Sequence, residues 1–343
     1  MRIGILNATG YSGAELVRFL STHPEFEISG VTARSHAGEL LGDVFPWLRA
    51  IGRPEYAELP LHKELDQAPD IVISCLPHTV SAETLKPFLD SQIRCIDVSA
   101  DFRLPDSKMY SRWHGQEHAA PEWLDSAVYG LTEFHREELR VAQLVANPGC
   151  HAGAAILALG PAARAGLLSG HVMVDSKTGV SGAGRSASVA YGFSEVDENA
   201  MAYGVANHYQ SPEISQQLSE LGRQVIQITF VPHLVPMTRG ILITAYASLT
   251  EGTTATDVQA AYGQAYADEP FVHLIDEPPR TKWTAGGNHA FVHWVLDEAS
   301  HTLVAMAATD NLGKGAAGSA VQNANAMSGI DESVGLEIPP SYP

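Results

Sequence analysis

The sequence predicts an α/β protein in which a Rossmann-type parallel-sheet domain is joined to a second, α+β domain with a mixed, largely antiparallel sheet. In the first half, continuous runs of Ile, Val and Leu alternate with helical segments, which is typical of a parallel sheet covered on both faces. In the second half, strand-like runs follow one another, and a short polar turn joins two of them, which indicates antiparallel pairing. The 343 residues, of which 45% are hydrophobic, suffice for two cores.

The expected elements can be placed in order along the chain. In the first half, the expected strands cover residues 2–6, 28–32, 70–75, 93–98 and 143–146, and the expected helices cover residues 11–21 and 80–89. The pattern changes from about His171, after which the expected strands cover residues 225–230, 241–248, 290–296 and 302–307, with a turn at residues 297–301. The closing segment 316–327 is predicted as a helix that follows a glycine-rich turn.

The charge balance and the cysteine count argue against several classes of protein. The formal net charge of −18 repels nucleic acid and anionic lipid, although a few cations focused in a cleft can still bind a phosphorylated small molecule. The three cysteines, Cys75, Cys95 and Cys150, cannot close a disulfide framework and match no zinc spacing, so we expect no metal. We find no signal peptide and no apolar run long enough to span a bilayer, which predicts a cytoplasmic protein.

The first turn between a strand and a helix predicts a dinucleotide-binding loop. It consists of Asn7 and Ala8 followed by the expected cofactor-binding residues Thr9, Gly10, Tyr11, Ser12 and Gly13. Free amides and the positive end of a helix dipole attract a pyrophosphate, and the two glycines permit close approach and tight packing. Asn7 stands where such loops usually have their first glycine, and Asn is among the few residues that tolerate left-handed backbone angles. The alternative is an ordinary tight turn.

The end of the second expected strand indicates which dinucleotide is bound. NAD enzymes commonly place an acidic residue there, to bind the ribose 2′-hydroxyl. This chain has Arg34 and Ser35 instead, which suit a 2′-phosphate and favour NADP(H), although Arg34 could also be a solvated loop cation.

Cys150 is the candidate nucleophile because a strand and a Pro148-Gly149 turn lead into a helix that begins near it. The positive end of the helix dipole stabilises a thiolate there, and the same amides are positioned to hold an oxyanion on a carbon bonded to the sulfur. We interpret Cys75 and Cys95 as buried apolar residues.

Several polar side chains are candidates for anion binding or acid–base chemistry beside the thiol. Arg103 follows the fourth expected strand and suits a phosphate, although a surface ion pair with Asp101 or Asp106 is an equal alternative. Lys177 and Arg185 flank a glycine-rich segment that suits an anion or a cofactor. The remaining candidates are His208 with Glu213 nearby, just before an expected helix, and His233, which residue type alone does not separate from His208.

Seven blocks of this sequence, in the expected order, resemble those of the N-acetyl-gamma-glutamyl-phosphate reductase family. They cover residues 7–13, 97–104, 147–150, 177–185, 207–213, 232–240 and 310–318. The blocks at 147–150 and 310–318 are the most specific. The wider class, which includes aspartate-semialdehyde dehydrogenase, shares the cysteine chemistry.

The resemblance implies a domain organisation and an assembly. Residues 1–149 with 312–343 would form the dinucleotide-binding domain, and residues 150–311 the catalytic and dimerisation domain of a homodimer or homotetramer.

The resemblance also implies roles for individual residues. Cys150 would be the nucleophile and His208 the acid–base group, while Arg103 would meet the phosphate of the substrate. We assign Lys177, Arg185 and Glu213 to substrate and phosphate, and we add Pro77, Ser181, Gly182 and Asn311 to the expected cofactor site, with Asn311 near the nicotinamide.

The implied reaction is the NADPH-dependent reduction of N-acetyl-glutamyl 5-phosphate to the 5-semialdehyde and phosphate, through a thioester on Cys150, in arginine biosynthesis. The chain departs from the family at Asn7 and at His208-Tyr209-Gln210, where the family often has His-Arg-His. The alternatives are the same chemistry on aspartyl phosphate or a carrier-bound aminoadipyl phosphate, a non-reducing cysteine acyltransferase or hydrolase, and a non-enzymatic NADP sensor.

Overall fold

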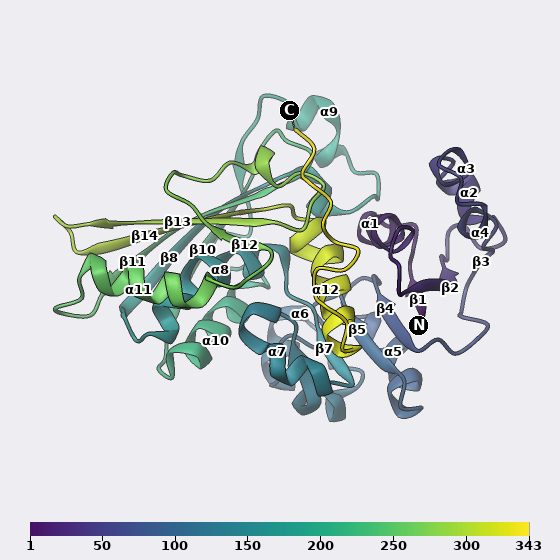
Figure 1. Ribbon diagram of the computed structural model, residues 1–343, viewed down its shortest axis with the longest axis horizontal. Coiled ribbons are helices and arrows are strands. Elements are labelled where there is room, and N and C mark those ends of the chain that lie inside the picture. Colours follow the sequence, from purple (N-terminus) through teal and green to yellow (C-terminus); the bar gives the residue numbers. More distant parts are fainter. Residues whose placement is uncertain (343) are drawn as a thin grey trace. The chain divides into compact units, whose positions relative to one another are not determined.

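The computed structural model describes residues 1–342 and divides them into two compact units (Figure 1). The first unit contains residues 1–148 and 316–337, and the second contains residues 149–315 and the segment from Ile338 onward. The chain therefore leaves the first unit at Pro148, builds the second, and returns with the closing helix. Gly149 and residues 312–315 and 338–342 belong to the second unit, whereas the sequence-based division placed them with the first.

The first unit is a parallel sheet with the strand order β3-β2-β1-β4-β5-β7-β6. Its strands are β1 (Arg2–Leu6), β2 (Glu27–Thr32), β3 (Leu61–His62), β4 (Ile71–Ser74), β5 (Arg94–Asp97), β6 (Ala127–Tyr129) and β7 (Leu144–Ala146). All of these strands pair in parallel. From β1 the chain builds the sheet outward through β2 and β3, and then returns to the other side of β1 with β4. Ligands of such sheets bind where the strand order reverses, here at the carboxyl ends of β1 and β4.

Helices and buried polar contacts complete this unit. Its helices are α1 (Tyr11–Leu20), α2 (Leu41–Val44), α3 (Trp47–Ala50), α4 (Pro54–Ala57), α5 (Ser81–Asp90), α6 (Ser107–His114), α7 (Thr132–Val141) and α12 (Gly318–Met327). On α12, Asn323 is fully buried, accepts a hydrogen bond from Thr132 Oγ1 and donates one to the carbonyl of Gly130. A buried amide must be satisfied in this way, so the contact fixes the closing helix against α7 and the end of β6.

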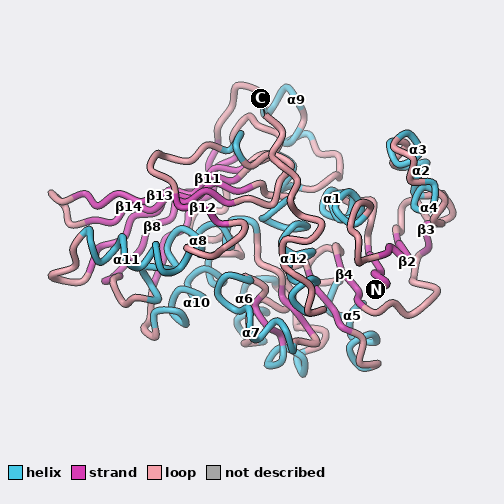
Figure 2. The backbone as a smooth tube through the Cα atoms, viewed as in Figure 1, coloured by secondary structure: helices cyan, strands magenta, loops and turns pink. Residues whose placement is uncertain are grey.

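The second unit is a mixed sheet with the strand order β12-β13-β14-β11-β8-β10-β9 (Figure 2). Its strands are β8 (Leu168–Thr178), β9 (Met201–Ala202), β10 (Gln227–Leu234), β11 (Ile241–Leu249), β12 (Val272–Leu274), β13 (Ala290–Asp297) and β14 (Thr302–Thr309). The pairs β8–β10 and β12–β13 are parallel, and the other pairs are antiparallel. Its helices are α8 (Cys150–Arg164), α9 (Phe193–Val196), α10 (Ser211–Gly222) and α11 (Ala255–Tyr266).

The helix α8 forms the core of the second unit. Every residue from His151 to Ala163 is buried, and most are Ala, Gly, Leu or Ile. Tyr262 and Tyr266 of α11 are buried beside it and donate hydrogen bonds to the carbonyls of Ala158 and Leu157. A helix that is apolar all round needs cover on all sides, which here comes from the sheet, α10 and α11.

The predicted fold class is confirmed, while several predicted elements were shifted or missing. The strand expected at residues 225–230 is β10, which begins at Gln227 and runs to Leu234. The prediction missed β8, the strand that lies between β11 and β10 in the second sheet. Its buried residues, such as Val172 and Val174, alternate with His171, Asp175 and Lys177, so the segment lacks the continuous apolar run that marked the other strands.

Candidate active site

In the first unit, the predicted cofactor-binding residues lie at the carboxyl ends of three adjacent strands. The loop at residues 7–10 follows β1, Arg34 and Ser35 follow β2, and Pro77 follows β4. Thr9 and Gly13 are buried, whereas Tyr11, Arg34, Ser35 and Pro77 are exposed. The sheet order thus gathers residues up to 70 positions apart at the point where the strand order reverses.

The start of α1 is suited to an anion. Within residues 1–342 the amides of Tyr11, Ser12 and Gly13 have no protein acceptor, and no acidic residue lies in the first turn of the helix. A Cβ atom on Gly13 would lie 2.5 Å from the carbonyl oxygen of Asn7, so only glycine permits this packing. Free amides at a helix N-terminus fit the pyrophosphate of a dinucleotide.

Asn7 takes the place of a glycine and also joins three strands. Its φ of 61° lies in the left-handed region that Asn tolerates. Its amide Nδ2 donates to the carbonyl of Cys75 after β4 (2.8 Å), and its backbone N–H donates to Thr32 Oγ1 at the end of β2 (3.1 Å). The departure from glycine is visible in the sequence, whereas the contact of this side chain with the neighbouring loop is visible only in the structure.

The loop after β4 is also held at its far end. Thr79 has a φ of 71°, an unusual value for a β-branched residue. Its N–H donates to Asp101 Oδ1 (2.7 Å), and the same fully buried carboxyl accepts hydrogen bonds from Ala82 N–H and the Tyr110 hydroxyl. The segment that carries Pro77 is therefore fixed at both ends.

Arg103 is buried at the carboxyl end of β5. Its guanidinium donates to the backbone carbonyls of Asn147 (Nε, 2.8 Å) and Val98 (Nη2, 2.8 Å). These contacts fix the direction of the side chain and tie β5 to the segment that precedes Cys150.

In the second unit, Cys150 is the first residue of α8 and is half-buried. Cys75 and Cys95 belong to the first unit, where burial raises the pKa of each thiol above its usual range. Neither of these two thiols is therefore suited to attack a substrate as a thiolate.

The amides at the start of α8 are already occupied, unlike those of α1. Glu213 Oε1 accepts a hydrogen bond from Gly149 N–H (2.8 Å), and Gln210 Oε1 accepts from the N–H groups of His151 (3.1 Å) and Ala152 (3.0 Å). Both side chains are buried. These three amides are therefore engaged by protein side chains, and Glu213 acts as a cap of α8. The oxyanion site expected at the start of this helix stays a prediction.

His208 is buried beside this helix, among aromatic rings. Its ring centroid lies 5.5 Å from that of His151 and 4.6 Å from that of Tyr209. Burial lowers the pKa of His208 to about 4, so the ring is neutral at pH 7. The N–H of Gln210 donates to Nδ1 (3.2 Å), so the ring proton is on Nε2. Neutral His208 can therefore donate a hydrogen bond through Nε2.

Two other predicted residues of this unit, Lys177 and His233, lie on neighbouring strands beside Asp175. Lys177 projects from the face of β8 opposite to the buried Ser176 and forms an ion pair with Asp175. His233 pairs in register with Lys177 and also lies close to Asp175, with 3.5 Å between His233 Nδ1 and Asp175 Oδ1. His208, and not His233, therefore shares the cluster at the start of α8. Arg185 is exposed in the loop after β8.

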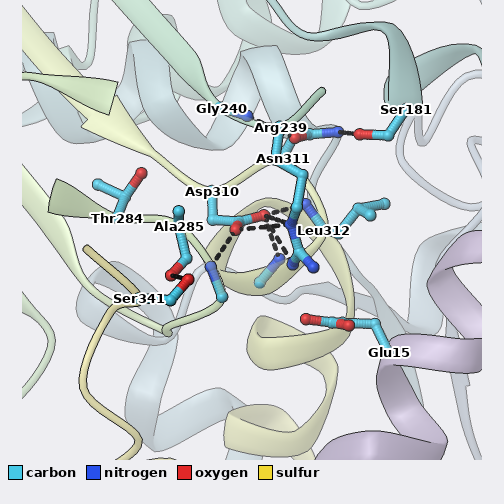
Figure 3. A network of polar contacts seen from close by, with 12 residues as sticks. Glu15, Ser181, Arg239, Gly240, Thr284, Ala285, Asp310, Asn311, Leu312 and Ser341 are labelled. Carbon is cyan, nitrogen blue, oxygen red and sulfur yellow. Dashed lines mark hydrogen bonds and ion pairs between the residues drawn. The ribbon is translucent and has the colours of Figure 1, made fainter. Parts of the chain in front are cut away.

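Ser181 and Asn311 are brought together across 130 positions of sequence. Asn311 is buried, donates through Nδ2 to Ser181 Oγ (2.9 Å) and accepts from Gly240 N–H (2.8 Å). The neighbouring Asp310 is fully buried and accepts from Arg239 Nε (2.9 Å) and from the N–H of Leu312 (2.8 Å) (Figure 3). This network fixes the loop after β14. Gly182 is exposed at the edge of the same group, where a Cβ atom would lie 3.9 Å from Asn311 Nδ2.

Sequence reasoning missed Tyr203 and Ser176, which both contact the side chain of His151. The distances are 2.9 Å from Tyr203 Oη to His151 Nε2 and 2.7 Å from Ser176 Oγ to His151 Nδ1. No signal in the sequence singles them out, because the three residues meet only through the folding of β8 and the segment after β9.

Two features, a metal-binding cluster and a membrane-spanning helix, are absent from the described part of the chain. No cluster of three or more His, Cys, Asp or Glu side chains suited to a metal ion is found in residues 1–342. Over the same residues, no helix is both long enough and apolar enough to cross a bilayer.

Family models match both units of the chain. Residues 2–142 match the semialdehyde dehydrogenase NAD binding domain, and residues 150–311 match the semialdehyde dehydrogenase dimerisation domain. The model also resembles the crystal structure of aspartate semialdehyde dehydrogenase II from Vibrio cholerae, with a TM-score of 0.72, 18% identity and coverage of 95% of this chain and 98% of that chain. Aspartate semialdehyde dehydrogenase with NADP from Candida albicans gives a TM-score of 0.71 at 15% identity, with coverage of 97% and 99%. The fold and the two matches define a semialdehyde dehydrogenase.

Curated relatives define the branch of this class. N-acetyl-gamma-glutamyl-phosphate reductase of Dehalococcoides mccartyi strain CBDB1 is 45% identical over 343 residues, which cover 100% of this chain and 99% of the relative. The protein of the same name from Heliobacterium modesticaldum is 42% identical over 351 residues and matches over the full length of both chains. The chain belongs to the N-acetyl-gamma-glutamyl-phosphate reductase family, which confirms the resemblance seen in its sequence.

Proposed function

We propose that this protein reduces N-acetyl-γ-glutamyl 5-phosphate to N-acetylglutamate 5-semialdehyde in arginine biosynthesis, through a thioester on Cys150. The observation that carries this is the position of Cys150: it is the half-buried first residue of the central helix of the second unit, and neutral His208 lies in the cluster beside that helix. Family membership supplies the substrate, and this geometry supplies a nucleophile and a hydrogen-bond donor.

The first half of the reaction is acyl transfer to the sulfur. The Cys150 thiolate attacks the carbonyl carbon of the acyl phosphate, and a C–S bond forms. The C–O bond to phosphate then breaks, and phosphate leaves with the bonding electron pair. Arg103 is our candidate for binding this phosphate, because its guanidinium is held in place by two backbone carbonyls.

The second half of the reaction is reduction and release. When bound, NADPH supplies a hydride to the carbonyl carbon of the thioester. The oxygen of the resulting thiohemiacetal carries negative charge, and the Nε2–H of His208 stabilises that charge. The C–S bond then breaks to give the aldehyde, and Cys150 returns to the thiolate.

The residues around the dinucleotide fit NADP(H) better than NAD(H). The amides at the start of α1 suit the pyrophosphate, and the exposed Arg34 and Ser35 after β2 suit a 2′-phosphate. Pro77, on its fixed loop, completes the site within the first unit. In the second unit we assign Ser181, Gly182 and Asn311 to the nicotinamide end, because the contacts of Asn311 hold them in place.

The bare face of the second sheet supports a homodimer. A row of paired residues crosses four strands: Met173 on β8, Tyr246 on β11, Val304 on β14 and Val295 on β13. Met173, Tyr246 and Val295 are 56%, 38% and 46% exposed, although the other face of the same strands is buried. An apolar row of this length is typical of an interface, and the family model for this domain is named for dimerisation. A tetramer would need a further contact.

We place the reaction in the cytoplasm, because Cys75, Cys95 and Cys150 are all free thiols.

The proposed function is tested by running the reaction backwards. The purified protein is mixed with N-acetylglutamate 5-semialdehyde, inorganic phosphate and either NADP or NAD, and the absorbance of the reduced nucleotide is followed. We expect phosphate-dependent reduction with a preference for NADP, a loss of at least about a thousandfold in the Cys150→Ser variant, and a smaller preference for NADP in Arg34→Ala. Turnover with aspartate semialdehyde instead would contradict the substrate, and unchanged activity of Cys150→Ser would contradict the mechanism.

A further inference from the structure

Three amides at the start of α8 are engaged by buried side chains, which directs attention to the other groups around Cys150. The N–H groups of Gly149, His151 and Ala152 already donate to Glu213 and Gln210. The two ring nitrogens of His151 contact two hydroxyl groups, those of Ser176 and Tyr203.

The hydrogen bonds among His151, Ser176 and Tyr203 determine which of their atoms carry protons. Burial lowers the pKa of His151 to about 3, so its ring is neutral at pH 7 and carries one N–H. Ser176 is fully buried, and within residues 1–342 its hydroxyl contacts only His151 Nδ1. If His151 donated to this hydroxyl, the hydroxyl hydrogen would be buried without an acceptor, so Ser176 donates and Nδ1 accepts. The ring proton of His151 is therefore on Nε2.

This tautomer of His151 determines whether the Tyr203 hydroxyl accepts or donates the hydrogen bond between them. The Nε2–H of His151 donates to Tyr203 Oη (2.9 Å), so Tyr203 accepts there and keeps its own hydroxyl proton for another partner. No acceptor for that proton is found in the described part of the chain.

Tyr203 belongs to the cluster at the start of α8. Its ring centroid lies 5.7 Å from that of His208 and 6.4 Å from that of His151, the residue that follows Cys150. Burial raises the pKa of the Tyr203 hydroxyl, and negative charge on Cys150 raises it further, so the hydroxyl stays protonated beside a thiolate.

We propose that Tyr203 directs its hydroxyl proton toward the negative charge of Cys150 and stabilises it, and that Ser176 and His151 are positioning residues that hold this proton in the donating orientation. The inference deepens the proposed function, since it assigns the group that activates the same nucleophile. It rests on Cys150 being that nucleophile, but not on the identity of the acyl substrate.

The test is the pH dependence of Cys150 alkylation by iodoacetamide, followed by intact mass in a background where Cys75 and Cys95 are Ala. This readout needs neither substrate nor cofactor, so it can fail independently of the proposed function. We expect Tyr203→Phe to shift the profile to higher pH and to lower kcat at least about tenfold with little change in KM, because the phenol proton is lost while the ring remains. Tyr342→Phe, which removes the hydroxyl of an exposed tyrosine outside this cluster, is the control and should match the parent.

The positioning residues are tested in the same assay. Ser176→Ala should shift the profile in the same direction by a smaller amount, and Ser176→Thr, which keeps the donor, should restore it. The ring ¹⁵N chemical shifts of His151 should show a protonated Nε2 and a bare Nδ1. A protonated Nδ1, or a Tyr203→Phe variant that is folded and matches the parent in both alkylation and kcat, would overturn the proposal.

Discussion

At the scale of single residues, the Glu213 side chain and the dipole of α8 act on Cys150 in opposite directions. The dipole of α8 favours a thiolate at its first residue. The Glu213 carboxyl accepts from Gly149 N–H, immediately before that residue, and so places an acidic group in front of the helix. Such a cap holds the helix start in position. Because it also offsets part of the dipole, we expect the helix to favour the Cys150 thiolate less than an uncapped helix would.

Replacing Glu213 with Gln keeps the hydrogen-bond acceptor and removes the acidic group. We expect the pH profile of Cys150 alkylation to move down by about one pH unit, since a nearby negative charge disfavours a thiolate. Glu220→Gln, an exposed change on the same helix, is the matched control and should leave the profile in place. A profile that moves up in Glu213→Gln would show that the carboxyl favours the thiolate, contrary to this interpretation.

At the scale of elements, strands buried on both faces were predictable and strands with one exposed face were less so. Most residues of β1 and β4 are Ile, Val or Leu, and the positions of these strands follow directly from the sequence. The strand β8 mixes Val172 and Val174 with His171, Asp175 and Lys177, because its second face is bare. Lys177, which was expected to meet substrate or phosphate, lies on the face of β8 opposite to Ser176, because side chains alternate along a strand. Its assignment stays a prediction.

The candidate site was predictable where it depends on chain order. Cys150 and the loop at residues 7–13 lie where a strand leads into a helix, a position that can be recognised from a short segment of sequence. The roles of Glu213, Gln210, Tyr203 and Ser176 depend on contacts with α8 from segments 25 to 64 residues away. Such contacts require the packed unit, which explains why the sequence alone did not assign them.

The bare sheet face carries a prediction of its own. Replacing Tyr246 or Val295 with Lys should convert a dimer into monomers, because an unpaired ammonium buried in an interface costs several kcal/mol and raises the dissociation constant at least about a hundredfold. Molar mass by light scattering during gel filtration gives the result directly. Val141→Lys, at an exposed position on α7 of the first unit, is the control. Tyr246→Lys and Val295→Lys variants that keep the parent's mass would place any interface elsewhere.

At the scale of the whole molecule, the proposed reaction needs groups from each of the two units. The first unit carries the free amides of α1, the exposed Arg34 and the loop fixed by Asn7 and Asp101, which suit a dinucleotide. The second unit carries Cys150 and His208, which suit the acyl group. Because both the nucleophile and the hydride are needed, neither unit is expected to be active alone.

The most direct measurement is the mass of the intact protein after mixing with N-acetylglutamate 5-semialdehyde and NADP in the absence of phosphate. Cys150 adds to the aldehyde, NADP accepts the hydride, and the thioester accumulates because no phosphate is present to release it. We predict a mass increase of one N-acetylglutamyl group, located on Cys150 by peptide mapping, which disappears when inorganic phosphate is added. Reduction of NADP with no mass increase, or with the acyl group on another residue, would contradict the account.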